Sequence, residues 1–303
     1  MTTKCQLVAE VGDDARFPEL ARGWFTGVLA EALPDLGAGL AAGPVLYKRD
    51  KRDAGPDVLW GEPHAVHAEL QVTKKPHGPL ARWVQYTPRA WRRFLDGLGE
   101  YPYGAVIGIT PLDERGRPVT YEGSASVRVT RLPDAPQWAT FSFSAGASVA
   151  DPSRAAGRWA AFARERAEAM HAVYADIGHG ASGYTLLEYA TGARPEQTIR
   201  RARSQLRGYS WATLVAPELV GRLGGISALR EAGAFDEVDE LGYGAAWLQA
   251  TADPGGYDEQ AARRVFDVLA PVLIGGRARR TPSKFQPPLA YDVNADDQRR
   301  EDS

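Results

Sequence analysis

Hydrophobic residues along the chain recur with two periods, one typical of helices and one typical of strands. Over residues 17–33 and again over residues 159–177, apolar side chains return every three or four positions, which predicts two amphipathic helices. Over residues 66–72 and 138–146, apolar and polar residues alternate. Alternation is typical of strands that place one face on the core and the other in water, and it favours antiparallel sheets.

The order of these elements is repeated along the chain. Residues 5–49 and residues 138–190 each predict a strand, a helix and a second strand. A proline-led helix follows in each half, within residues 83–99 and 211–225. A repeat at about 130 residues indicates two similar lobes, because solenoid repeats are only about 20–50 residues long. We therefore predict an α+β fold of two similar lobes, each an antiparallel sheet with helices packed on one face; a ferredoxin-like pattern is one arrangement that fits.

Composition and periodicity place the domain boundaries. The chain holds 32 glycines and 21 prolines, which is typical of many turns and short elements. The sequence Asp151-Pro152-Ser153 interrupts the pattern between the halves, and the periodicity fails after Gly275. We predict a first lobe, a linker, a second lobe and an irregular, partly disordered tail, at residues 1–146, 147–157, 158–275 and 276–303.

Charge and cysteine content narrow the classes of function. The formal net charge is −2, so the chain has no overall field that would attract nucleic acid or an anionic membrane. Its single cysteine cannot form an intramolecular disulfide, which fits a reducing cytosol. The first residues lack the apolar core of a signal peptide, and no stretch is long and apolar enough to span a bilayer. We expect a cytoplasmic protein without a membrane segment.

The motifs of familiar enzyme classes are largely missing from the sequence. Gly37–Ala42 matches a relaxed dinucleotide fingerprint, but a predicted helix precedes it and a predicted strand follows, the reverse of the order that phosphate binding requires. We therefore expect a loop there. His64 and His67 are three residues apart, so on a strand they point to opposite faces, and we expect no metal site and no cofactor.

One group of residues supplies candidates for a catalytic site, although none of its members is specific for acid–base chemistry. His67 and Glu69 share one face of a predicted strand, because strand side chains alternate with a period of two. Tyr121 and Arg128 lie near them on other predicted strand segments. These four residues are our candidates for a catalytic site, in an enzyme that acts on small molecules in a cleft between the two lobes.

Positive charge is concentrated at one place, next to aromatic residues. The set comprises Arg200, Arg201, Arg203, Arg207, Tyr209 and Trp211. Arginine beside aromatic rings suits phosphates or acidic partners. The alternative is a solvated helix face, with Ile199, Ala202 and Leu206 turned to the core. An acidic run over residues 231–240 polarises the same lobe, which favours a protein partner over nucleic acid.

Three stretches of the second half share a pattern with a known family. They are a proline-led helix ending in Leu-Gly-Gly within residues 207–229, a strand ending in Gln-Ala at residues 246–250, and a closing helix with Leu-Ala-Pro within residues 265–273. Together they resemble the C-terminal portion of a bacterial type VI secretion immunity-like family. The first stretch of that family reads aromatic-Leu-x-Leu, from which this chain departs. The resemblance implies a cytosolic protein that neutralises an effector by binding it, and it transfers no catalytic residue.

The leading hypothesis is therefore a non-enzymatic cytosolic binding protein, an immunity or self-protection factor whose protein partner contacts the arginine-rich segment. The alternative is the small-molecule enzyme described above. Nucleic-acid binding through the arginines is a third hypothesis, and the near-neutral net charge argues against it.

Overall fold

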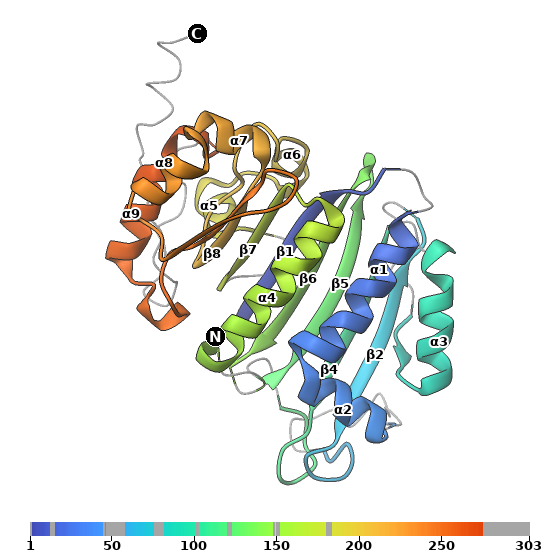
Figure 1. The fold of residues 1–303 in the computed structure, drawn as a ribbon. Helices are drawn as coiled ribbons and strands as arrows, with labels where there is room; N and C mark the ends of the chain where they lie inside the picture. The colour runs from blue at the N-terminus through green and yellow to red at the C-terminus, as the bar shows by residue number, and fades with distance from the viewer. Residues whose placement is uncertain are drawn as a thin grey trace. The chain divides into compact units, whose positions relative to one another are not determined.

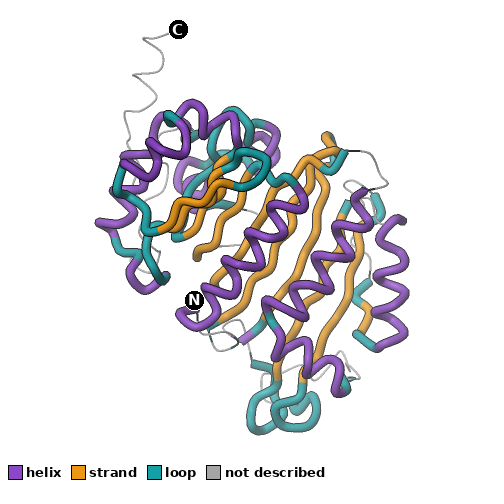
Figure 2. The backbone as a smooth tube through the Cα atoms, viewed as in Figure 1, coloured by secondary structure: helices purple, strands orange, loops and turns teal. Residues whose placement is uncertain are grey.

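A computed structural model of the chain describes residues 2–12, 16–44, 46, 58–75, 82–100, 103–119, 123–147, 149, 152–179 and 184–274. These residues form an α+β fold whose paired strands run antiparallel, which confirms the predicted fold class (Figure 1, Figure 2). Backbone contacts divide the chain into two compact units. We call Val11–Arg158 the first unit, and Thr3–Glu10 together with the chain from Trp159 onward the second unit. The predicted tail at residues 276–303 lies outside the described residues.

The first unit is a sheet in the strand order β3-β2-β4-β5-β6. Its strands are β2 (Val66–Thr73), β3 (Val84–Gln85), β4 (Gly104–Pro111), β5 (Ala125–Leu132) and β6 (Ala135–Gly146). Its helices include α1 (Arg16–Gly27), α2 (Pro34–Ala42) and α3 (Pro88–Asp96). Because β4, β5 and β6 are neighbours in space and in sequence, the sheet is a meander and lacks the alternating helices of a ferredoxin-like lobe.

Alternation along these strands separates an apolar from a polar sheet face. Trp24 of α1 contacts Phe141 and Phe143 of β6, with ring centroids 5.9 and 6.0 Å apart. Figure 1 shows α1 lying over the sheet and running nearly along the direction of its strands. Residues of the opposite parity, such as Gln71 and Arg128, therefore face away from α1. The helix-on-one-face arrangement predicted from alternation thus holds in this unit.

The glycine motif of the first unit lies in a helix rather than in the predicted loop. After α1 the chain makes a π-helical turn, Val28–Ala32, and α2 then begins at Pro34. A Cβ on Gly37 would lie 2.1 Å from the carbonyl oxygen of Leu29, and one on Gly39 would lie 2.5 Å from a methyl group of Val66. The glycines therefore permit close packing of α2, and their match to the dinucleotide fingerprint is coincidental.

The second unit is a sheet in the order β1-β7-β8-β10-β9. Its strands are β1 (Thr2–Glu10), β7 (Tyr174–His179), β8 (Ala212–Val215), β9 (Glu237–Glu240) and β10 (Ala246–Gln249). Helix α4 (Pro152–Met170) leads into it, and its other helices are α5 (Leu186–Thr191), α6 (Pro195–Arg200), α7 (Pro217–Arg222), α8 (Gly225–Glu231) and α9 (Glu259–Leu269). The predicted duplication and the boundaries at residues 146 and 158 stay predictions.

Two predicted elements of the second unit are wrong. The helix expected to continue to Ile177 ends at Met170; His171 adopts a positive φ of 50°, and β7 follows. The strand expected over residues 184–190 is instead helix α5. Thr185 and Glu188 form a capping box, each side chain accepting a hydrogen bond from the other's backbone amide, and this fixes the start of the helix.

Candidate functional site

The structure places three of the four catalytic candidates, His67, Glu69 and Arg128, on the polar sheet face of the first unit, but it does not bring the three together. His67 and Glu69 lie on β2, with Nε2 and Oε1 separated by 4.0 Å. Arg128 lies on β5, two strands away in the sheet order, which corresponds to roughly 10 Å across the strands. Tyr121 lies outside the described residues. The described candidates thus form one pair and one separate arginine.

His67 is covered by an aromatic ring. Only 4% of the residue is exposed, and the Trp60 ring meets the imidazole edge-on, with centroids 5.0 Å apart. Alternation along the strand predicted a solvent-exposed side chain for His67. The Trp60 ring packs against the imidazole and helps to exclude solvent from it. Among the described residues, no group of three or more histidine, cysteine, aspartate or glutamate side chains could hold a metal ion.

The predicted partner-binding set is split between surface and core. Arg200 ends α6, and Arg201 and Arg203 lie in the turn that follows, so the expected helix from residue 200 to residue 207 does not form. All three are exposed. Arg203 pairs with Glu218 at 2.8 Å and Glu10 at 3.4 Å. Binding of a partner by these arginines stays a prediction.

The other three members of that set are interior residues of the second unit. Arg207 is 0% exposed, Tyr209 is 1% exposed and Trp211 is 3% exposed. Trp211 donates its indole N–H to the carbonyl oxygen of Thr251 at 2.8 Å. Their side chains therefore contribute to the core, and the surface part of the predicted set is reduced to the three arginines before them.

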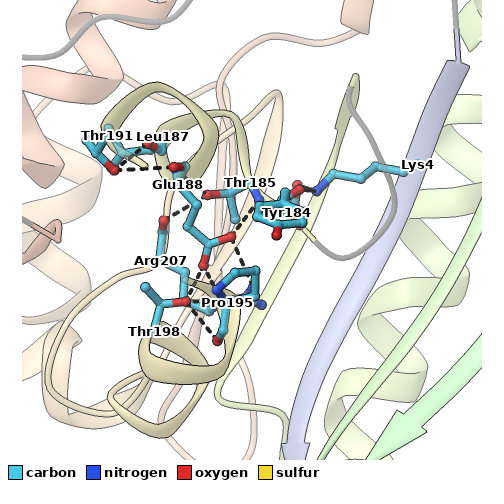
Figure 3. A network of polar contacts seen from close by, with 10 residues as sticks. Lys4, Tyr184, Thr185, Leu187, Glu188, Thr191, Pro195, Thr198 and Arg207 are labelled. Carbon is cyan, nitrogen blue, oxygen red and sulfur yellow. Dashed lines mark hydrogen bonds and ion pairs between the residues drawn. The ribbon is translucent and has the colours of Figure 1, made fainter. Parts of the chain in front are cut away.

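A buried ion pair explains why Arg207 is inside (Figure 3). Its Nε lies 2.9 Å from Oε1 of Glu188, and both side chains are fully buried. The Glu188 carboxylate also accepts hydrogen bonds from the Thr185 backbone amide at 2.7 Å and from the Thr198 hydroxyl. A buried ion pair is tolerable only when further hydrogen bonds replace the lost hydration of the charges. This network ties α5 and α6 to the chain segment at Arg207.

A second buried ion pair holds the start of α5. Lys4 of β1 lies 3.2 Å from Oδ2 of Asp176 on β7, and each side chain is 1% exposed. Lys4 also donates to the backbone carbonyl oxygen of Tyr184, as Figure 3 shows. Ser210 donates to the same Asp176 oxygen at 3.4 Å. The backbone that enters α5 is therefore fixed to the sheet by a charged group as well as by its cap.

The sheet face beneath α5 and α6 is polar to its centre. Gln6 lies opposite Asp176 in the antiparallel register, and Tyr174 lies two residues before Asp176 on β7. Both atoms of the Gln6 amide, the Tyr174 hydroxyl and the second Asp176 oxygen are buried without a hydrogen-bond partner among the described residues. Burial, and then the nearby Asp176 carboxylate, raise the pKa of the Tyr174 hydroxyl well above its usual value.

Exposed tyrosines and arginines lie on the same segment and at its two ends. Tyr184 is 45% exposed and Tyr189 is 42% exposed. Arg194, Arg200 and Arg201 are exposed as well. We call these five residues the tyrosine–arginine surface. Tyrosine and arginine are enriched among the residues that dominate protein–protein binding energies.

Sequence reasoning predicted Arg200 and Arg201 of this surface as contact residues but missed Tyr184 and Tyr189, because helix α5 was predicted as a strand. The signal that identifies it is the spacing Thr-x-x-Glu at Thr185 and Glu188, followed by Pro195 at the first position of α6. The combination indicates two short helices in succession. A short helix that packs one side on buried residues leaves its other side exposed; Tyr189 of α5 is exposed, as is Tyr184 two residues before the helix.

Comparison with known proteins gives a fold relationship. No protein-family model matches the chain, and no curated protein is similar to it in sequence. Among solved structures, the chain is similar to the Pseudomonas aeruginosa T6SS protein PA0821, with a TM-score of 0.55 and 11% sequence identity. The similarity covers 97% of this chain and 80% of that protein. No described helix has the length and apolar character needed to cross a membrane.

Proposed function

We propose that this protein is a type VI secretion-associated binding protein that acts in the cytoplasm and neutralises a protein effector, as an immunity factor does. The observation that carries the proposal is the tyrosine–arginine surface, which is held in place from below by the Glu188–Arg207 ion pair. The whole-length similarity to a T6SS protein and the resemblance of the second half to an immunity-like family support the biological setting.

The physical argument rests on preorganisation. A surface loop that must be ordered on binding costs about 0.5–1.5 kcal/mol for each immobilised side chain, beyond the loss of backbone freedom. Here the backbone of α5 and α6 is already fixed by buried charges at Lys4, Glu188 and Arg207. More of the interaction energy of the exposed rings and guanidinium groups is then available for affinity.

The test is co-expression with the product of each adjacent gene, followed by size-exclusion chromatography with light scattering. We expect a stoichiometric complex with one of them. The double variant Tyr184→Ala/Tyr189→Ala should weaken that complex about thirtyfold or more, the effect of losing about 2 kcal/mol at a binding hot spot. Trp83→Ala is the matched control, because Trp83 is also an exposed aromatic residue, 39% accessible, in the first unit.

Two results would contradict the proposal. One is a protein that stays uncomplexed with every neighbouring product at micromolar concentration. The other is a complex that the tyrosine double variant and Trp83→Ala weaken equally, because the binding surface would then lie elsewhere.

A second candidate function is catalysis on a small molecule. The observation in its favour is that His67, Glu69 and Arg128 share the polar sheet face of the first unit. It predicts that the purified protein consumes a compound from a bacterial metabolite extract and that His67→Gln abolishes this. An extract left unchanged by the wild-type protein would dispose of this candidate.

A further inference from the structure

The first unit contains a cavity of about 150 Å³ where its polar sheet face ends. Strands β2, β4 and β5 form its floor, Lys75 lies just after β2, and Tyr103 lies just before β4. A water molecule occupies about 30 Å³ in the liquid, so the space suits a few waters or one small anion. Its location in the first unit makes it independent of the tyrosine–arginine surface.

The charged side chains around this cavity have one sign. Lys75, Arg128 and Arg131 line it, and no carboxylate is among the described residues of its wall. The side chains of Lys75 and Arg128 make no ion pair or hydrogen bond with another described residue. Arg131 is 5% exposed, and its Nε donates to the Pro136 carbonyl oxygen at 2.6 Å. The positive charges of Lys75 and Arg128 are therefore not neutralised by any carboxylate among the described residues.

The register of the sheet shows why the Arg128 side chain has no partner among the residues that the structure describes. Its neighbours across the strands are Val106 on β4 and Ser142 on β6, and Ser126 and Thr130 are next to it on the same face of β5. None of these side chains carries a negative charge. Burial by the surrounding protein also lowers the pKa of Arg128, because burial disfavours the charged form.

Hydroxyl groups complete the set of donors. Thr73, Thr130 and Tyr103 line the same cavity, and their O–H groups can donate to an oxygen that approaches Arg128 and Lys75. A guanidinium fork matches the geometry of two oxygens on phosphate or sulfate, and an ammonium adds a point charge from another direction. We propose that this cavity binds a doubly charged tetrahedral oxyanion of the phosphate or sulfate class, with Arg128 and Lys75 as its principal ligands.

The test titrates inorganic phosphate into the full chain at constant ionic strength, with chloride as the balancing salt. Calorimetry should give a saturable isotherm, and the thermal midpoint should rise with the logarithm of phosphate concentration. Arg128→Gln should weaken binding about tenfold or more, and Lys75→Gln should weaken it by a smaller factor. Arg89→Gln is the matched control, because Arg89 is an exposed arginine on α3 that does not line the cavity.

Two further experiments identify the source of the anion and control for misfolding of the Arg128→Gln variant. Glycerol phosphate that binds more tightly than inorganic phosphate would indicate a larger phosphorylated ligand, and the reverse order would indicate the free ion. Arg128→Lys should keep the fold and the charge while losing the fork, and so should bind with intermediate affinity. The proposal is overturned if phosphate gives no saturable response, if acetate binds as well as phosphate, or if Arg128→Gln and Arg89→Gln behave alike.

Discussion

Each of the two units has a sheet with one polar face, and the two polar faces differ in what covers them. In the first unit, Arg128 and Lys75 border a cavity and have no partner among the described residues. In the second unit, Lys4 and Arg207 are buried, and each is paired with a carboxylate. The difference arises in part from residues 184–200, because Glu188 pairs with Arg207 and the Tyr184 carbonyl oxygen accepts from Lys4, whereas the partner carboxylate of Lys4, Asp176, belongs to the sheet itself. Alternation predicts which face of a sheet is polar. Whether that face stays exposed or is buried depends on which other segments of the chain pack on it.

The largest expected effect comes from breaking the buried pair of the second unit. Arg207→Met leaves the Glu188 carboxylate buried without its counter-charge, and we expect a loss of about 3–5 kcal/mol in the free energy of unfolding. Arg203→Met is the matched control, since its pairs with Glu218 and Glu10 are partly exposed and should contribute about 1 kcal/mol at most. Urea denaturation of both variants makes the comparison.

A double variant sharpens this test. In Glu188→Leu/Arg207→Met both charges are gone, so most of the lost stability should return, because a buried pair is worth little against apolar residues of similar volume. Equal destabilisation of the single and double variants would show that the threonine hydrogen bonds, rather than the charges, hold α5 and α6.

The next effect tests how tightly the same segment is packed. A Cβ on Gly208 would lie 2.7 Å from the Thr185 hydroxyl oxygen and 2.8 Å from its Cβ. Gly208→Ala should therefore displace the helix cap and cost about 1–3 kcal/mol, as overpacking does. Gly221→Ala in α7 meets nothing within 4 Å and should stabilise the protein by about 0.5–1 kcal/mol. Stability changes of the same sign in both variants would contradict the packing argument.

These contacts also show where sequence reasoning reached its limit. Strand alternation predicted β2 and β6 because the signal is local and repeats every second residue. The burial of Arg207 depends on Glu188, nineteen residues earlier along the chain, and no local pattern encodes that contact. The polarity of His67 predicted exposure, yet a ring from Trp60 covers it. The burial of a charged residue thus cannot be predicted from local sequence, because it depends on a partner far away in the chain.

A smaller effect on stability is expected from a substitution on the polar sheet face of the first unit. Arg128→Gln removes a charge with no partner among the described residues, so the free energy of unfolding should change by no more than about 0.5 kcal/mol in chloride buffer. Lys4→Met removes a buried positive charge from the second unit and leaves the Asp176 carboxylate buried without its ion-pair partner. The loss in the free energy of unfolding should therefore be several times larger. Thermal unfolding without added phosphate measures both. A large loss for Arg128→Gln would mean that this arginine is structural.

The smallest effect concerns two carboxylates, one in each unit, whose pKa values shift in opposite directions. Hydrogen bonds from the backbone amide of Arg117, at 2.9 Å, and from that of Arg115, at 2.8 Å, lower the pKa of Asp113. Partial burial, and then the neighbouring Asp239, raise the pKa of Glu237 even though Arg164 lies 2.7 Å away. Protons therefore bind Asp113 less readily, and Glu237 more readily, in the folded state than in the unfolded state.

Linkage turns these shifts into opposite pH slopes. The contribution of Asp113 to the free energy of unfolding is fully present above its pKa in the unfolded state, and it is lost as the pH falls through its lowered pKa in the folded state. That of Glu237 is complete below its unfolded pKa and is lost as the pH rises through its raised folded value. Asp113→Asn should therefore cost more stability at pH 7 than at pH 3, whereas Glu237→Gln, which mimics the protonated acid, should gain stability relative to wild type over the same rise. Unfolding curves recorded between those two pH values distinguish the cases, and parallel curves for both variants would show that neither carboxylate is coupled to folding.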